Sequence, residues 1–82
     1  MKTYIITCLD KKNSLKKRLA NRDLHLKYLK SLKNKLILAG PIFNKTNKPK
    51  GSVLILKFQN TFELNNFLKN DPYSKVGLFE TV

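Results

Sequence analysis

The segment Ser52–Phe58, SVLILKF, contains four consecutive apolar residues, Val53–Leu56. A short run of β-branched and aliphatic residues is typical of a β-strand. Successive side chains of a strand point to opposite faces of its sheet, so this strand has apolar side chains on both faces. The segment Leu36–Leu38 shows the same pattern. We therefore expect a sheet that is covered on both faces, since large exposed apolar patches are rare on monomers.

The rest of the chain alternates between strand and helix patterns. Asn60 lies three residues before Glu63, which is the spacing of a capping box at the start of a helix. The resulting order, β-α-β-β-α-β, predicts an α+β fold of the ferredoxin-like, split βαββαβ type. We expect strands at Thr3–Leu9, Leu36–Phe43, Ser52–Phe58 and Lys75–Val82, a short helix from Asn13 or Ser14 to Leu19, a helix over Arg22–Lys35, and a helix that begins at Asn60.

The helices of this order are enough to cover one face of a four-stranded sheet. The second face then needs a partner, because the strand at Val53–Leu56 is apolar on that side too. The sequence therefore predicts a homodimer that packs sheet against sheet.

The net charge of the 82-residue chain is +12, and 15 of its 17 basic residues are lysine. The lysines are spread from Lys2 to Lys75 and do not cluster on one element. Sites that recognise nucleic-acid bases depend on arginine forks and aromatic platforms. We expect non-specific attraction to polyanions at low salt, and no specific nucleic-acid partner.

The length of the chain predicts a single domain over residues 1–82. Cys8 is the only cysteine, which excludes an intramolecular disulfide and a cysteine-based zinc site, and we expect it in the core. No apolar run approaches the roughly 20 residues of a membrane span, so we expect a cytoplasmic protein. The chain has no glycine-rich phosphate loop, no G-x-S-x-G motif and no metal-ligand cluster. We therefore expect no metal and no cofactor.

Three stretches together resemble the YciI-like, or YCII-related, family. RDLHLKYL, Arg22–Leu29, resembles the family's R-x-x-H-L-x-x-L element. LILAGPIF, Leu36–Phe43, is similar to its second strand, which carries an A-G-P turn. DPYSKVGLFE, Asp71–Glu80, resembles its D-P-[YF]-x-x-x-G-[LV]-[FY]-E ending. The resemblance covers nearly the whole chain.

The resemblance implies a dimeric α/β barrel of ferredoxin-like subunits. It also implies a pocket between sheet and helices in each subunit, lined by a helix histidine and the aspartate of the D-P motif. Those positions are His25 and Asp71 here. A few relatives remove HCl from chlorinated intermediates of aromatic degradation or catalyse related lyase reactions.

His25 is the only histidine, and two interpretations of it stay open. A histidine carries protons well near neutral pH, and a carboxylate on one ring nitrogen would fix its tautomer. Asp71 follows 46 residues later, so any contact between the two is tertiary. Alternatively, His25 points to solvent or seals the edge of the core. Asp71, followed by Pro72, is also a good cap for a short helical turn, a role that is compatible with the first.

Four further residues are candidates for substrate binding. Arg22 lies three residues before His25, on the same helix face, and its guanidinium can hold a carboxylate. It can equally be a surface arginine. Gly40 and Pro41 either allow the backbone to approach a ligand closely or mark a strand end or bulge. Tyr73 either caps the pocket or packs in the core.

These residues favour cofactor-free acid–base chemistry on a small anionic molecule. His25 would move the proton, Asp71 would orient the imidazole and Arg22 would hold the negative end of the substrate. Elimination, as in a lyase or dehydrochlorinase, or isomerisation next to a carbonyl fits such a site, because each needs only a proton moved. The alternative is a non-catalytic accessory module whose pocket or basic surface binds a small molecule, a protein or RNA.

Overall fold

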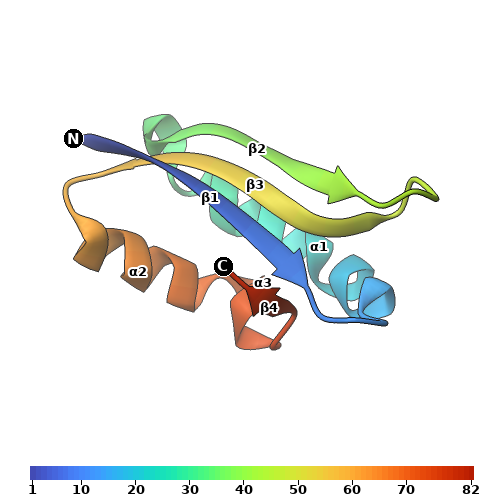
Figure 1. The fold of residues 1–82 in the computed structure, drawn as a ribbon. Coiled ribbons are helices and arrows are strands. Elements are labelled where there is room, and N and C mark those ends of the chain that lie inside the picture. The colour runs from blue at the N-terminus through green and yellow to red at the C-terminus, as the bar shows by residue number, and fades with distance from the viewer.

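The computed structural model describes residues 1–82 and contains one four-stranded antiparallel sheet with helices packed against it (Figure 1). The strands lie in the order β2-β3-β1-β4, so β2 and β4 are the edges. The ferredoxin-like α+β fold predicted from the sequence is confirmed. The elements are β1 (Lys2–Asp10), α1 (Leu15–Lys30), the 3₁₀ turn η1 (Lys33–Lys35), β2 (Leu36–Phe43), β3 (Pro49–Phe58), α2 (Thr61–Asn70), α3 (Pro72–Lys75) and β4 (Phe79–Thr81).

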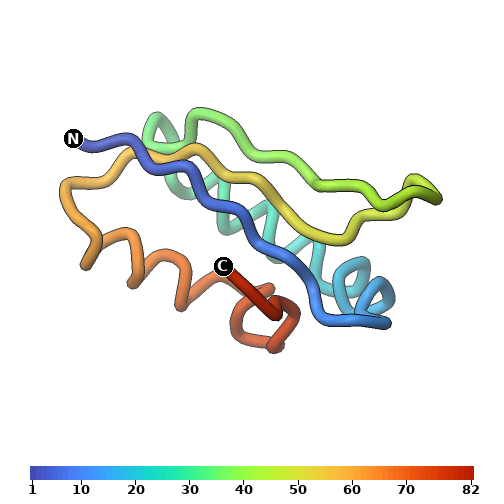
Figure 2. The backbone as a smooth tube through the Cα atoms, in the orientation of Figure 1, coloured from blue at the N-terminus to red at the C-terminus, as the bar shows by residue number.

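The central pair of strands, β1 and β3, is continuous from the Lys2–Phe58 pair to the Leu9–Gly51 pair. A Cβ atom at Gly51 would overlap the carbonyl oxygen of Cys8, so glycine is required at this close approach. The C-terminal segment returns to the end of β1, where β4 pairs with it (Figure 2). This return brings Asp71 and Tyr73 against α1, where they contact His25.

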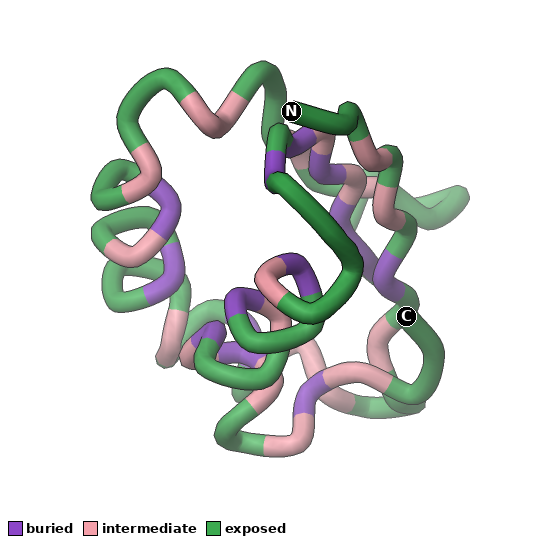
Figure 3. Tube along the Cα trace, turned by 90° about the vertical axis from the view of Figure 1, so that its left-hand side faces the viewer, coloured by how far each residue is buried: buried purple, intermediate pink, exposed green.

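The core lies between the helices and one face of the sheet, and Figure 3 shows the buried stretches gathered there. Tyr28 of α1 stacks on Phe67 of α2, with ring centroids 4.8 Å apart. The Tyr28 hydroxyl also donates a 2.8 Å hydrogen bond to the Phe67 carbonyl oxygen, which ties the two helices together. The buried core residues are Leu29, Leu54, Leu56, Phe58, Leu64 and Phe67.

The predicted helices before Leu19 and over Arg22–Lys35 are wrong as separate elements, because α1 is one helix over Leu15–Lys30. No glycine or proline interrupts it, and the Asn21 side chain donates to the Lys17 carbonyl oxygen at 2.9 Å, on the helix itself. The helix ends five residues before the predicted end at Lys35. Lys33 adopts a left-handed φ of 54°, which an α-helix cannot accommodate.

The capping predictions have mixed outcomes. Ser14 occupies the cap position of α1, but its side chain makes no capping hydrogen bond and donates to the Lys12 carbonyl oxygen at 3.2 Å instead. Asn60 caps α2 as predicted, since its Oδ1 accepts from the Glu63 backbone N–H at 3.0 Å. The Glu63 carboxylate reaches back to the N–H of Gln59 at 2.9 Å.

The predicted final strand, Lys75–Val82, is largely wrong. Residues Pro72–Lys75 form α3, Gly77 turns the chain with a φ of 70°, and the strand covers only Phe79–Thr81. The reason is the Asp71–Pro72 cap, which starts a helical turn before the strand pattern can begin. Strand β2 is an edge as expected, but its irregularities fall at Leu36–Leu38 and Ile42–Phe43, on either side of Gly40-Pro41.

The face of the sheet opposite the helices carries apolar side chains in register. Ile5 pairs with Ile55, which pairs with Leu38 on the neighbouring strand. Ile5 is 71% exposed and Leu38 is 51% exposed in the single chain. The homodimer through this face stays a prediction. None of the helices combines the length and apolar character that a membrane span requires.

Candidate functional site

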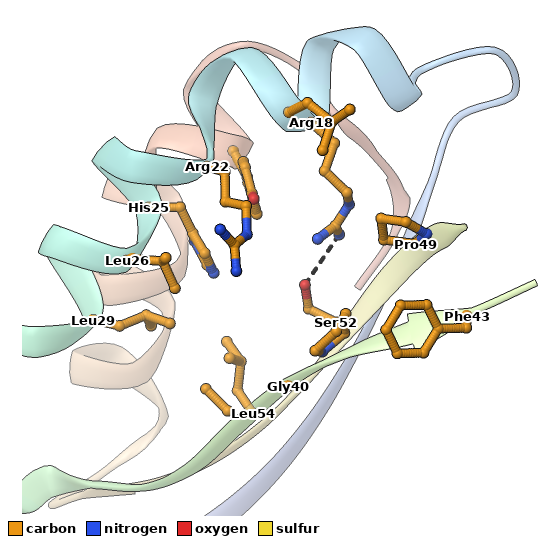
Figure 4. Close-up of a pocket in the computed structure, with 14 residues that line it drawn as sticks. Arg18, Arg22, His25, Leu26, Leu29, Gly40, Phe43, Pro49, Ser52 and Leu54 are labelled. Atoms are coloured by element: carbon orange, nitrogen blue, oxygen red, sulfur yellow. Dashed lines mark hydrogen bonds between the residues drawn. The ribbon is translucent and has the colours of Figure 1, made fainter. Parts of the chain in front are cut away.

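A cavity of about 310 Å³ lies between α1 and the strands β2 and β3 (Figure 4). Helix α1 contributes residues seven and four positions apart, which share one helix face. His25 and the four candidate binding residues all line it. The lining comprises Arg18, Leu19, Arg22, His25, Leu26 and Leu29 of α1, Ala39, Gly40, Pro41 and Phe43 of β2, Pro49, Ser52 and Leu54 of β3, and Tyr73 of α3.

His25 and Asp71 meet in the wall of this cavity. His25 Nδ1 lies 2.8 Å from Asp71 Oδ1, and the two residues are 5% and 1% exposed. His25 is thus a buried, paired group and not a residue of a solvated helix face. Asp71 does not line the cavity itself but lies behind the imidazole. An ionised carboxylate only accepts hydrogen bonds, so Nδ1 carries a proton and Nε2 is left toward the cavity.

Asp71 has the two roles that the sequence left open. Its Oδ1 also accepts from the Tyr73 backbone N–H at 3.0 Å, which caps α3. The cap fixes the carboxylate and therefore the direction of the hydrogen bond to His25. Asp71 Oδ2 is buried without a hydrogen-bond partner.

Tyr73 packs against the imidazole of His25. The rings lie 4.0 Å apart between centroids and 14° from parallel, and Phe79 supports Tyr73 edge-on at 5.9 Å. Burial is the largest of several influences on the Tyr73 phenol and raises its pKa. The hydroxyl therefore stays protonated over the physiological range. Tyr73 is only 1% exposed, so it supports the wall of the cavity and does not cap its mouth.

Arg18 is the residue that sequence reasoning missed. Its Nε and Nη2 donate to Asp10 at 2.6 and 2.9 Å, and Nη2 also donates to Ser52 Oγ at 3.0 Å. Its guanidinium carbon lies 4.7 Å from the centroid of the Tyr73 ring. Burial by itself would lower the pKa of Arg18, but the hydrogen bond and charge of Asp10 outweigh it and raise that pKa. The only sequence signal was its position seven residues before His25, on the same helix face.

Arg22 differs from Arg18 because it is exposed and makes no hydrogen bond or ion pair. Figure 4 shows its guanidinium beside His25 at the cavity. Its charge is therefore free to meet a ligand. A Cβ atom at Gly40 would meet no heavy atom within 4 Å, so no neighbouring protein atom demands glycine there.

Cys8 lies in the core as expected, with 0% exposure. Burial first, and then the charge of Asp71, raise the pKa of its thiol to about 11. The thiol is therefore protonated and shielded, which disfavours a role as nucleophile. The structure contains no group of three or more His, Cys, Asp or Glu side chains placed to hold a metal ion.

Comparison with known proteins gives relatives over nearly the whole chain. An uncharacterised protein of Haemophilus influenzae (strain ATCC 51907 / DSM 11121 / KW20 / Rd) is 36% identical, and the alignment covers 96% of this chain and 89% of the relative. Protein YciI of Escherichia coli O6:H1 is 34% identical, with the same shares covered.

A solved structure is also similar to this fold. It is the 5-chloro-2-hydroxyhydroquinone dehydrochlorinase TftG of Burkholderia phenoliruptrix AC1100, in complex with 2,5-dihydroxybenzoquinone. The TM-score is 0.90 at 33% identity, and the match covers 98% of this chain and 87% of that chain. The YCII-related domain matches residues 2–82. The chain therefore belongs to the YCII-related domain family, as its motifs indicated.

Proposed function

We propose that this protein catalyses a cofactor-free proton transfer on a small anionic molecule bound in the cavity, with elimination or isomerisation as the outcome. The observation that carries the proposal is the buried 2.8 Å contact between His25 Nδ1 and Asp71 Oδ1, with the imidazole lining the cavity. His25 is the proton carrier, Asp71 is a positioning residue and Arg22 binds the substrate's negative end.

The geometry supports each role. Asp71 holds the tautomer that leaves the lone pair of Nε2 available, and its charge stabilises the imidazolium that forms when Nε2 takes a proton. Tyr73 keeps the imidazole from rotating out of this position. Arg22 is free of protein partners and close to His25, so it attracts an anionic group toward the base.

The similar dehydrochlorinase supports elimination as the reaction class. In an elimination, a base removes a proton and a leaving group such as chloride departs with its bonding electrons. The proton and the leaving group come from the same molecule, so no external oxidant or reductant is consumed. The residues at this cavity supply a base and an anion-binding cation, which is what the step requires.

The test is an assay of the protein with 5-chloro-2-hydroxyhydroquinone, following chloride release, together with proton–deuterium exchange next to the carbonyl of small keto acids. We expect activity in the wild type and a loss of about 100-fold or more in His25→Gln, which keeps a polar side chain but cannot carry the proton. Lys17→Ala, an exposed cation on the same helix, is the matched control and keeps full activity.

Two results would contradict the proposal. Equal rates for wild type and His25→Gln would exclude His25 as the proton carrier. Binding of small anions without turnover or exchange would instead support a non-catalytic binding module.

We also propose that the subunit forms a homodimer through the open face of the sheet. Ile5, Ile55 and Leu38 lie in register there and present apolar area that a second copy would bury. Sedimentation equilibrium at micromolar concentration is expected to show a dimer for wild type and a monomer for Ile5→Glu. Phe62→Glu is the control, since Phe62 is equally exposed, at 73%, but lies on α2. A stable wild-type monomer would refute the dimer.

A further inference from the structure

The cavity presents hydrogen-bond donors without any carboxylate in its lining. Two acidic side chains, Asp10 and Asp71, pair with lining residues but lie behind them. A ligand in the cavity therefore meets the guanidinium and imidazole groups and not the acids that hold them. The donors fall into two groups, one at Arg18 and Ser52 and one at Arg22, beside His25.

The donors around Arg18 are only partly used by the protein. Nε and Nη2 bind Asp10 and Ser52, whereas Nη1 has no acceptor in the protein. Ser52 Oγ accepts from Arg18, so its own hydroxyl hydrogen is available to donate. Arg18 and Ser52 are 4% and 3% exposed, so the donors are held in place and largely shielded from water. A preorganised pair of this kind favours an acceptor oxygen.

The donor beside His25 is Arg22, and it differs from Arg18 in that no carboxylate balances its charge. Arg22 is unpaired and keeps a full positive charge next to the imidazole. The charge of Arg18, in contrast, is balanced by Asp10. A negative charge on the ligand is therefore better placed at the His25–Arg22 end, while the Arg18–Ser52 end needs only a hydrogen-bond acceptor.

Both ends of the cavity contact the ring of Tyr73. The guanidinium carbon of Arg18 lies 4.7 Å from the centroid of that ring, and the centroid of the His25 imidazole lies 4.0 Å from it. The guanidinium and the imidazole are therefore less than about 9 Å apart. The rest of the lining is mainly apolar, including Leu26 and Leu54, so the cavity fits one small flat ring with a substituent at each end.

We propose that the cavity selects bifunctional ligands, with an anionic oxygen group at the His25–Arg22 end and an acceptor oxygen held by Arg18 and Ser52 at the other. Arg18 and Ser52 are then the residues that determine specificity. This inference rests on the proposed function, because it concerns the substrate class of the same site, but it makes a separate prediction.

The test compares two probes of nearly equal shape by isothermal titration calorimetry. Both 4-acetylbenzoate and 4-isopropylbenzoate carry a carboxylate, and they differ by an acceptor oxygen in place of a methyl group. We expect the acetyl compound to bind wild type about tenfold more tightly, because the isopropyl group leaves buried donors unpaired. The preference is expected to fall about threefold or more in Ser52→Ala and to disappear in Arg18→Lys, and to stay unchanged in Lys17→Ala.

Ser52→Ala preserves the Asp10–Arg18 pair, so it tests the inference even where Arg18→Lys fails to fold. Equal affinity of wild type for the two probes would overturn the inference and leave the proposed anion site standing. A preference that survives both variants would overturn the assignment to Arg18 and Ser52. Failure of folded wild type to bind either probe would overturn the inference together with the proposed anion site.

Discussion

His25 Nδ1 and Asp71 Oδ1 lie 2.8 Å apart, although 46 residues of chain separate them. The contact joins the third turn of α1 to the cap of α3, and it determines which ring nitrogen carries the proton. Because the carboxylate accepts from Nδ1, the neutral imidazole has its lone pair on Nε2. The first prediction follows from this tautomer.

Asp71→Ala is expected to release the tautomer of His25. Without the carboxylate, no acceptor holds the ring proton on Nδ1, so the neutral imidazole exchanges between its two tautomers and Nε2 keeps its lone pair for only part of the time. We expect the two ¹⁵N shifts of the single histidine to move toward one another relative to wild type, in long-range ¹H–¹⁵N spectra recorded at alkaline pH. Turnover should fall by about 100-fold or more, the scale of a lost general base. Identical ¹⁵N shifts in both proteins would show that Asp71 does not orient the ring.

The Asp10–Arg18 ion pair is expected to contribute strongly to stability. Asp10→Ala leaves a guanidinium that is 4% exposed without its carboxylate, and breaking a buried pair in this way costs about 3–5 kcal/mol. The free energy of unfolding in urea measures the loss. Asp23→Ala is the matched control, because Asp23 is an exposed acid of α1, and it should change stability by less than about 0.5 kcal/mol. Similar effects for the two variants would contradict the prediction.

Removal of the hydroxyl is expected to affect stability differently at Tyr28 and at Tyr4. Tyr28→Phe deletes the 2.8 Å hydrogen bond to the Phe67 carbonyl oxygen and should cost about 1 kcal/mol. The Tyr4 hydroxyl is buried without a partner, so Tyr4→Phe should leave stability unchanged or raise it. Urea unfolding of the two variants measures both effects. A larger loss for Tyr4→Phe than for Tyr28→Phe would show that the Tyr4 hydroxyl is satisfied in solution.

The burial of the Cys8 thiol is expected to reduce the stability of the protein at high pH. Its thiol pKa is about 11 in the folded chain against an ordinary value of 9.0, because burial disfavours the thiolate. The folded pKa is raised, so this stabilisation is complete below the unfolded pKa and is lost as the pH rises from about 9 to about 11. The difference in unfolding free energy between wild type and Cys8→Ala should shrink across that window. A difference in unfolding free energy that stays constant between pH 9 and pH 11 would contradict this prediction.

Because its thiol is buried, Cys8 is also expected to react slowly with thiol reagents in the folded protein. Native protein at pH 8 should react with a disulfide reagent only as fast as it opens, and urea should release the thiol at once. Rapid labelling under native conditions would show that the end of β1 is more accessible than the structure indicates.

Much of the fold depended on residues close together in the chain. The short runs of β-branched and aliphatic residues in β1, β2 and β3, the Asn60–Glu63 cap and the Asp71–Pro72 step each act within a few positions. The sequence therefore predicted them and the βαββαβ order. The extent of α1 was not predictable in this way. The helix cannot continue through Lys33, which has a left-handed backbone conformation. Nothing in the identity of a lysine predicts that conformation.

The residues of the site likewise include some that the sequence predicted and one that it did not. The family motifs pointed to His25 and Asp71, and the structure brings the two together. Arg18 had no local signal, because a basic residue on a lysine-rich helix is usually solvated. It is buried only because Asp10, at the end of β1, and Ser52, on β3, meet it from 8 and 34 residues away. Contacts over such separations depend on how α1 packs on the sheet, and the tertiary structure alone decides that packing.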